Sequence, residues 1–277
     1  MLSKIILNSL KGSFLAILKN KKTFFLVFIL QLLFFFLVLL ATAVYISNIV
    51  INSQNILEYA EKLNLNPKTA SFDMLQQKSP LGDDPLLISR NYDEIIKNFV
   101  FLLLFIFIIF SLVNGLAWYF ASGISDKNLF SLKNIFSYLS KFFMISLFFI
   151  PLLYFFLYNI LNVAFSKFLS KEPKSYIPLA IIALILIYFI YILMPILGKI
   201  KLKGMAKKSF SIGTKNFIPV TVSYLIIISL IALSFLLIYY LINLNLLLLL
   251  IAFVLAVFVF SWGKVYFTVV VRKLSGL

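Results

Sequence analysis

Long apolar runs alternate with shorter polar segments along this chain. A helix needs roughly 20 apolar residues to cross a bilayer and satisfies its backbone hydrogen bonds internally, so each such run predicts a transmembrane helix. A cleavable signal peptide is the alternative for the first run, because Ala41-Thr42-Ala43 near its end resembles a cleavage site, but the run is long for one. We therefore expect six spans, at residues 23–46, 98–121, 142–164, 176–197, 217–242 and 244–262.

A short motif, Lys-x-x-Phe-x4-Lys, precedes three of these runs. It occurs as KGSFLAILK, KNIFSYLSK and KKSFSIGTK, beginning at Lys11, Lys133 and Lys207. On a helical wheel the lysines fall mostly on one side and the apolar residues on the other, as in a helix that lies in the membrane interface and reaches anionic headgroups. The candidate headgroup or interface residues are Lys11, Phe14, Lys19, Lys133, Phe136, Lys141, Lys207, Phe210 and Lys215.

The position of the motif predicts a threefold internal repeat. We expect an all-α membrane protein whose six transmembrane helices form three hairpins, each preceded by a cytoplasmic amphipathic interfacial helix. The chain would then be one membrane domain, residues 1–277, with pseudo-repeats 1–122, 123–198 and 199–277. Simple topological anchoring is the alternative for the lysines, since loops of any multi-pass protein are rich in lysine on the cytoplasmic side.

Charge sets the expected orientation. If the N-terminus is inside, most lysines and arginines fall in cytoplasmic segments, so the positive-inside rule predicts that both termini are cytoplasmic. The loop at residues 166–175 opposes this rule, because it carries three lysines on the predicted outer side. Residues 52–97 would form an external loop with seven of the nine acidic residues. Too few large apolar residues occur there to build a separate core, so we expect a small external cap.

Composition limits the chemistry that the chain can perform. It is 63% hydrophobic, carries a formal net charge of +16, and contains no histidine and no cysteine. Disulfides, thiol nucleophiles and imidazole acid–base chemistry are therefore excluded. The lysines lie beside apolar spans rather than in a basic groove, which argues against nucleic-acid binding. We expect no enzyme activity and no catalytic, cofactor or metal site.

A few polar residues interrupt the apolar spans. The candidates for contacts inside the membrane are Gln31, Asn114, Asn159 and Asn162, and we expect them to form interhelical hydrogen bonds that contribute to packing. Asn114 is followed by Gly115, with Trp118 nearby in the same span. Lys264 lies just beyond the last predicted span, and we expect its side chain to extend along the helix to the cytoplasmic interface, with a buried functional cation as the alternative.

One resemblance follows from the repeated arrangement, of which KGSFLAILKNKKTFFLVFILQLL is the clearest copy. In architecture, over its whole length, the chain resembles six-span bacterial and archaeal membrane proteins that look related to the membrane domain of some glycerophosphodiester phosphodiesterases. No diagnostic motif accompanies the resemblance. It implies residence in a prokaryotic cell membrane rather than activity, because the catalytic barrel of those enzymes uses acids and histidine that have no counterpart here.

Two functions remain open at this point. The first is a non-enzymatic multi-pass protein that organises membrane lipids, mainly anionic ones, or partner proteins, which accounts for the repeated cationic helices. The alternative is the permease subunit of an ABC-type exporter with an ATPase partner, which accounts for one such helix but not for three. A threefold carrier is a poorer match, because carriers place their amphipathic helices within each hairpin.

Overall fold

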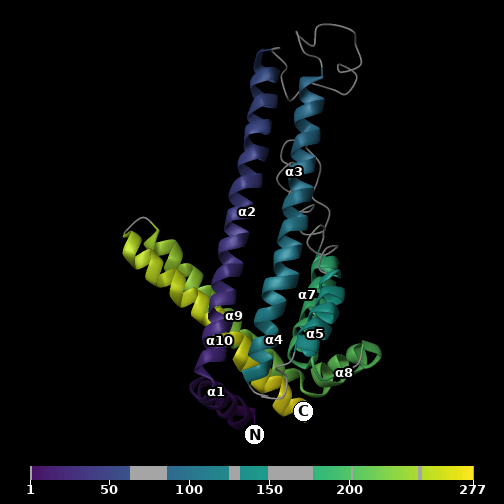
Figure 1. Cartoon of the computed structure of the whole chain (residues 1–277), viewed down its shortest axis with the longest axis vertical. Helices are drawn as coiled ribbons and strands as arrows, with labels where there is room; N and C mark the ends of the chain where they lie inside the picture. Colours follow the sequence, from purple (N-terminus) through teal and green to yellow (C-terminus); the bar gives the residue numbers. More distant parts are fainter. Residues whose placement is uncertain are drawn as a thin grey trace. The chain divides into compact units, whose positions relative to one another are not determined.

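The computed structural model describes residues 2–62, 86–124, 132–148, 177–200, 202–242 and 245–276, and the regular elements within them are all helices (Figure 1). The chain divides into two compact units. The first unit comprises Met1–Phe35, Phe110–Leu152 and Ser175–Leu277, and the second comprises Phe36–Ile109 and Leu153–Lys174. Helix α2 contributes residues to both.

Four helical stretches are long and apolar enough to cross a membrane: Lys21–Tyr59, Leu87–Ile124, Phe217–Leu241 and Leu246–Ser275. They coincide with the first, second, fifth and sixth predicted spans, so this is an integral membrane protein whose described elements are helical. The third predicted span, 142–164, lies largely outside the described residues. The fourth corresponds to α7 (Ile177–Leu193), and its described apolar stretch, Ile185–Ile196, is shorter than a span. The six-span count therefore stays a prediction.

The second unit contains the later part of α2 (Lys21–Lys62) and α3 (Leu87–Ile109). With 42 residues, α2 is about 63 Å long at 1.5 Å per residue, more than twice the roughly 30 Å of a hydrocarbon core. Helix α2 continues into the segment 52–97 as far as Lys62, and α3 begins within it at Leu87, while its place outside the membrane stays a prediction. Two amide pairs join these helices, Asn48 to Asn98 and Asn55 to Asn91, each at 3.3 Å.

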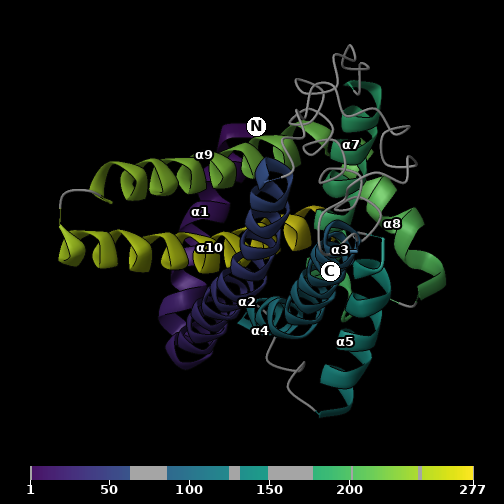
Figure 2. The ribbon, with the colours of Figure 1, turned by 90° about the horizontal axis from the view of Figure 1, so that it is seen from above.

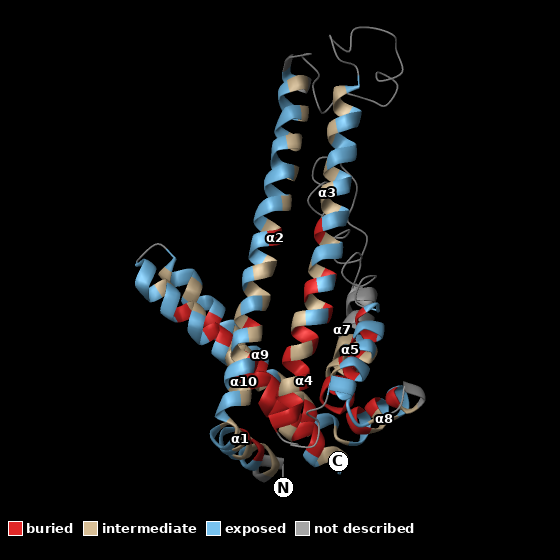
Figure 3. Ribbon diagram, viewed as in Figure 1, coloured by how far each residue is buried: buried red, intermediate tan, exposed pale blue. Residues whose placement is uncertain are grey.

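The first unit holds the remaining described helices. They are α1 (Leu2–Lys19), the π-helical turn η1 (Phe110–Asn114), α4 (Gly115–Ile124), α5 (Leu132–Ser146), α7, the 3-10 turn η3 (Met194–Ile196), α8 (Leu202–Lys215), α9 (Phe217–Leu241) and α10 (Leu246–Ser275). Helices α9 and α10 run side by side as a hairpin (Figure 2). Burial concentrates on α4 and on the C-terminal half of α10 (Figure 3).

The C-terminal half of α10 is enclosed on all sides. Every residue from Ser261 to Thr268 is buried, although two turns of helix point side chains in all directions. Helices α1, α4, α8 and α9 and the turn η3 all contact α10. Gly263 permits one of these approaches, since a Cβ atom there would lie 3.0 Å from the side chain of Ile227 on α9. This enclosure determines the environment of Lys264.

Asparagines end two of the motif-bearing helices. Asn20 separates α1 from α2, and its side-chain amide donates to the carbonyls of Ala16 at 3.2 Å and Ile124 at 3.0 Å. Asn216 occupies the same position between α8 and α9. The second copy of the motif differs, because α5 continues through Lys141 to Ser146. The three copies thus lie on α1, α5 and α8, while the threefold repeat itself stays a prediction.

Helices α7 and α8 approach each other closely at Gly213. A Cβ atom there would lie only 2.7 Å from the ring of Phe189, so a larger residue would force the helices apart. Two hydrogen bonds cross the same contact, from the Ser209 hydroxyl to the Phe189 carbonyl at 2.7 Å and from the Tyr188 hydroxyl to the Gly213 carbonyl at 3.1 Å. Gly213 lies two residues before the end of α8 and permits this close packing.

Candidate functional site

A buried lysine of α10 contacts side chains from three other helical segments of the first unit. Lys264 on α10 donates hydrogen bonds from Nζ to Oε1 of Gln31 on α2 and, at 2.6 Å, to Oδ1 of Asn114 in η1. The ammonium also lies 5.9 Å from the ring centroid of Trp118 on α4, within the range of a cation–π contact. Three helical segments that are distant in sequence therefore meet at one cation.

The position of Lys264 corrects the expectation that its side chain reaches the membrane interface. Only 5% of the residue is exposed, and Gln31 and Asn114 are 2% and 8% exposed. Arg272, near the C-terminal end of α10, is eight residues away, or about 12 Å along the helix axis. The Lys264 ammonium instead turns toward α2 and η1, because the surrounding helices leave it no lateral route to the interface.

The π-helical turn places Asn114 at this site. A π turn inserts an extra residue into the i→i−4 pattern of a helix, and such turns recur at functional sites. Just after it, Gly115 allows α4 to contact α5, since a Cβ atom there would lie 3.0 Å from Leu139 and 3.1 Å from the ring of Phe142. The local sequence Asn114-Gly115 thus combines a polar side chain with a close helix contact.

No carboxylate balances the charge of Lys264 in the described part of the first unit. The described residues of this unit include neither Asp nor Glu, because its one acidic residue, Asp126, lies outside them. Lys264 forms no ion pair with any residue that the structure describes. Amide oxygens lower the free energy of a buried ammonium but do not neutralise it, so the site carries a net positive charge when Lys264 is protonated.

A cavity of about 230 Å³ adjoins this cluster. Its lining includes the three residues of the cluster, and the other lining residues are aromatic or branched aliphatic. The lining residues are Gln31, Phe34, Phe110, Asn114, Trp118, Tyr191, Tyr224, Ile227, Ile228, Ile231, Phe260 and Lys264. Two rings of the wall pack edge to face, Trp118 and Tyr191, with centroids 5.1 Å apart, and Tyr224 lies 5.1 Å from Tyr191. The cavity therefore has a cationic end and an apolar, mostly aromatic wall.

The structure brings together two of the four predicted polar contacts. Gln31 and Asn114 share Lys264, whereas Asn159 and Asn162 lie outside the described residues. Sequence reasoning missed the third member of the cluster, because Lys264 was assigned to the interface. The signal that could have identified it was its distance from the basic end of α10, together with two uncharged polar side chains in other spans.

The motif residues divide into two groups. Lys11, Phe14, Lys19, Lys133, Phe136, Lys207, Phe210 and Lys215 are exposed. Lys141 is half-buried and donates from Nζ to the carbonyls of Leu197 at 3.2 Å and Ile200 at 2.9 Å. It therefore satisfies carbonyls in the segment after α7 and η3, a structural use that differs from contact with a lipid headgroup.

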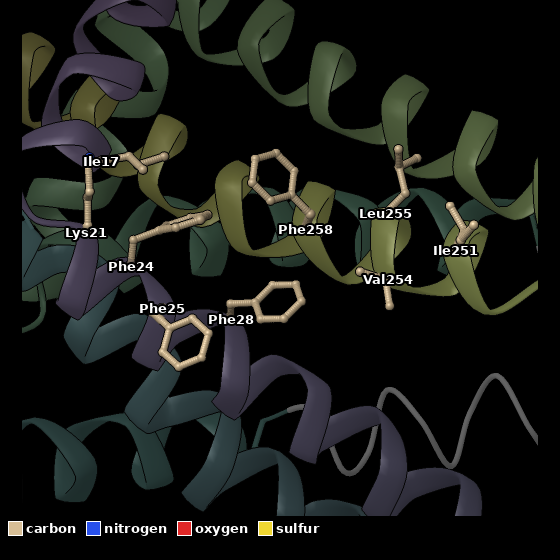
Figure 4. A pocket seen from close by; sticks show the side chains of 9 residues that line it. All are labelled: Ile17, Lys21, Phe24, Phe25, Phe28, Ile251, Val254, Leu255 and Phe258. Atoms are coloured by element: carbon tan, nitrogen blue, oxygen red, sulfur yellow. The ribbon is translucent and has the colours of Figure 1, made fainter.

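An apolar groove of about 660 Å³ lies elsewhere in the first unit (Figure 4). Aromatic residues of α2 form one side, apolar residues of α10 form the other, and Lys21 is its only charged lining residue. The lining residues are Ile17, Lys21, Phe24, Phe25, Phe28, Ile251, Val254, Leu255 and Phe258. Both helices are long and apolar enough to cross a membrane, so this groove is of a kind that can hold an acyl chain.

No protein-family model, no curated protein and no solved structure matches this chain.

Proposed function

We propose that this integral membrane protein binds a singly charged anion within the membrane, at the cavity beside Lys264. The observation that supports the proposal is a lysine ammonium, 5% exposed, with two neutral amides as its hydrogen-bond partners. Ionisable residues inside membrane helices are rare and mark substrate or ion pathways. Binding of an anion is the step that a carrier or a receptor for such a ligand requires.

The energetics of burial favour an anion as the missing partner. Removing an ammonium from water still costs several kcal/mol after the protein relaxes, whereas a hydrogen bond to a charged group returns only about 1.5–3 kcal/mol. The two amides together return about 3–6 kcal/mol, which is comparable to that cost, but they leave the charge of Lys264 without an opposite charge. A bound anion would neutralise the site, and the attraction is stronger in an apolar cavity than in water.

Thermal unfolding of the protein in nanodiscs tests this function. We would add sodium chloride, sodium acetate or sodium benzoate at constant ionic strength, with bulky gluconate as the balancing anion. A ligand that binds only the folded state stabilises it by RT ln(1 + [L]/Kd), about 2.7 kcal/mol at 100 times Kd. At least one small anion should raise the unfolding temperature of the wild type but not that of Lys264→Gln.

Lys273→Gln is the matched control, because Lys273 lies on the same helix but is exposed. It should respond to the anion as the wild type does. An equal response in all three proteins, or none in the wild type, would contradict anion binding at Lys264.

A second candidate function, the organisation of anionic phospholipid, is favoured by the groove between α2 and α10. Its apolar lining suits an acyl chain, and Lys21 at its edge suits a phosphate. The exposed motif lysines on α1, α5 and α8 would add to this attraction, each by about 1 kcal/mol near an anionic surface. This candidate and the anion site involve different residues, so both can hold.

Lipid retention tests the second candidate. After reconstitution with phosphatidylcholine and phosphatidylglycerol, the protein would be extracted in mild detergent and its bound lipids measured by mass spectrometry. Joint replacement by glutamine of Lys11, Lys19, Lys133, Lys207 and Lys215 should lower the retained phosphatidylglycerol, whereas Lys97→Gln in the second unit should not. Equal retention in both variants would leave topological anchoring as the role of these lysines.

The exporter alternative and the relation to the phosphodiesterase membrane domain stay predictions. An exporter permease requires a surface that docks an ATPase, and the described part of α5 offers no feature that favours one. Co-purification of a stoichiometric ATP-binding subunit from native membranes would support that alternative.

A further inference from the structure

We infer that the ligand of the Lys264 cavity is a small carboxylate with a flat apolar body, such as an aromatic acid. This inference rests on the anion-binding function proposed above and adds the chemical class of the ligand. Three features of the cavity support it: the hydrogen-bond donors around Lys264, the aromatic wall, and the volume.

The polar end of the cavity offers donors. An ammonium has no acceptor, so the amide oxygens of Gln31 and Asn114 must face Lys264, and each NH2 group is directed elsewhere. These NH2 groups form no hydrogen bond among the described residues. The ammonium itself has three donors and uses two of them here. An ionised carboxylate accepts hydrogen bonds only, at two oxygens, and therefore complements this set.

The aromatic lining of the cavity favours a ligand with a flat apolar ring. Phe34, Phe110, Trp118, Tyr191, Tyr224 and Phe260 line the cavity together with three isoleucines. Aromatic rings prefer offset-stacked or edge-to-face partners, and Trp118, Tyr191 and Tyr224 already pack against one another in this way. A flat ring can join such a cluster without displacing its members. A hydrated inorganic ion would make no apolar contacts with these aromatic and isoleucine side chains.

The volume limits the size of the ligand. Engineered apolar cavities of about 150 Å³ bind one benzene molecule. At about 230 Å³, this cavity has room for one ring of that size and a carboxylate. It has about a third of the volume of the groove between α2 and α10, which separates the two sites by size. The single uncompensated cation further favours a monoanion over a dicarboxylate or a phosphate dianion.

Tryptophan fluorescence in nanodiscs provides the test. The protein has two tryptophans, so Trp262→Phe leaves Trp118 in the cavity wall as the reporter. Four probes separate the features of the ligand: benzoate has ring and charge, acetate only the charge, benzyl alcohol only the ring, and benzylamine the opposite charge. Chloride serves as the inorganic anion. Calorimetry on the wild type checks that the Trp262→Phe change does not alter binding.

Benzoate should bind roughly 10- to 100-fold more tightly than acetate, benzyl alcohol or chloride, and benzylamine should not bind. Lys264→Gln should abolish benzoate binding. Asn114→Asp is the sharper variant, because it keeps the size of the side chain and gives Lys264 a carboxylate partner within the protein. The Asn114→Asp protein should fold, and its affinity for benzoate should be roughly 10- to 100-fold lower than that of the wild type.

The possible failures are distinguishable. If chloride or acetate binds as tightly as benzoate and depends on Lys264, the anion site stands and the aromatic class is overturned. If benzyl alcohol binds as tightly as benzoate, or if no probe binds to the wild type, both the ligand class and the proposed function are overturned. Benzoate binding that survives in a folded Asn114→Asp protein would also overturn the inference.

Discussion

Removing the amide partners of Lys264 should destabilise the protein, and removing the lysine as well should restore its stability. In Gln31→Leu/Asn114→Leu the ammonium loses both of its hydrogen-bond acceptors. A hydrogen bond to a charged group contributes about 1.5–3 kcal/mol, so the double variant should lose about 3–6 kcal/mol of unfolding free energy. The loss arises because a buried cation remains without compensation.

Adding Lys264→Met to the double variant removes that cation. Replacing buried ionic groups by apolar residues of similar volume is often neutral or stabilising by about 1–4 kcal/mol. The triple variant should therefore be at least as stable as the wild type, although it carries one more substitution than the double variant. It should also bind no anion, because its cavity has no charge.

Reversible unfolding in mixed micelles, followed by circular dichroism, measures these free energies. The matched control is Asn48→Leu/Asn98→Leu, which removes an exposed amide pair in the second unit. It should change stability by less than about 1 kcal/mol. If the double variant at Gln31 and Asn114 is as stable as this control, or if Lys264→Met brings no recovery, Lys264 is not held by these amides and extends to the interface instead.

Three further predictions follow from the helix contacts. Gly213→Ala should lower the free energy of unfolding by about 1–3 kcal/mol, because its Cβ atom would lie 2.7 Å from the Phe189 ring of α7. At Gly204 a Cβ atom would lie 3.7 Å from its nearest neighbour, so Gly204→Ala should be neutral or slightly stabilising in thermal unfolding. Lys141→Met should lower the free energy of unfolding by about 1–3 kcal/mol, because the carbonyls of Leu197 and Ile200 lose their hydrogen-bond donor. Lys133→Met, at an exposed position, should change the free energy of unfolding little, and equal losses in the two variants would contradict these hydrogen bonds. The Tyr138 hydroxyl donates a hydrogen bond to the Met194 carbonyl of η3 at 2.8 Å. Tyr138→Phe should therefore lower the free energy of unfolding by about 1–3 kcal/mol, and an unchanged unfolding temperature would argue against this hydrogen bond.

The spanning helices α2, α3 with α4, α9 and α10 could be predicted from sequence because each is a local property of a long apolar run. The motif lysines were recognised for the same reason, as charged residues that recur before such runs. Their individual roles were not, since Lys141 contacts carbonyls beyond α7 that are more than fifty residues away in sequence. Hydropathy patterns contain no information on which helices pack together.

Lys264 illustrates the same limit at the candidate site. On its own helix it lies among apolar residues near the basic end, which is typical of a side chain that extends to the interface. Its burial depends on α1, α4, α8 and α9 packing around α10, and its partners come from α2 and η1. Gln31 and Asn114 were identified as intramembrane polar residues, but their common partner could be found only from the tertiary structure.

The most direct test of the anion site is a solid-state NMR distance measurement in proteoliposomes. The protein would carry ¹⁵N-labelled lysine, and carboxyl-¹³C benzoate would be added. The Lys264 ammonium resonance is assigned by its loss in Lys264→Gln. The account predicts that the benzoate carboxyl carbon dephases this resonance at a separation typical of a hydrogen-bonded ammonium and carboxylate, and that Asn114→Asp removes the effect. Dephasing confined to the exposed lysines, with none at Lys264, would contradict it.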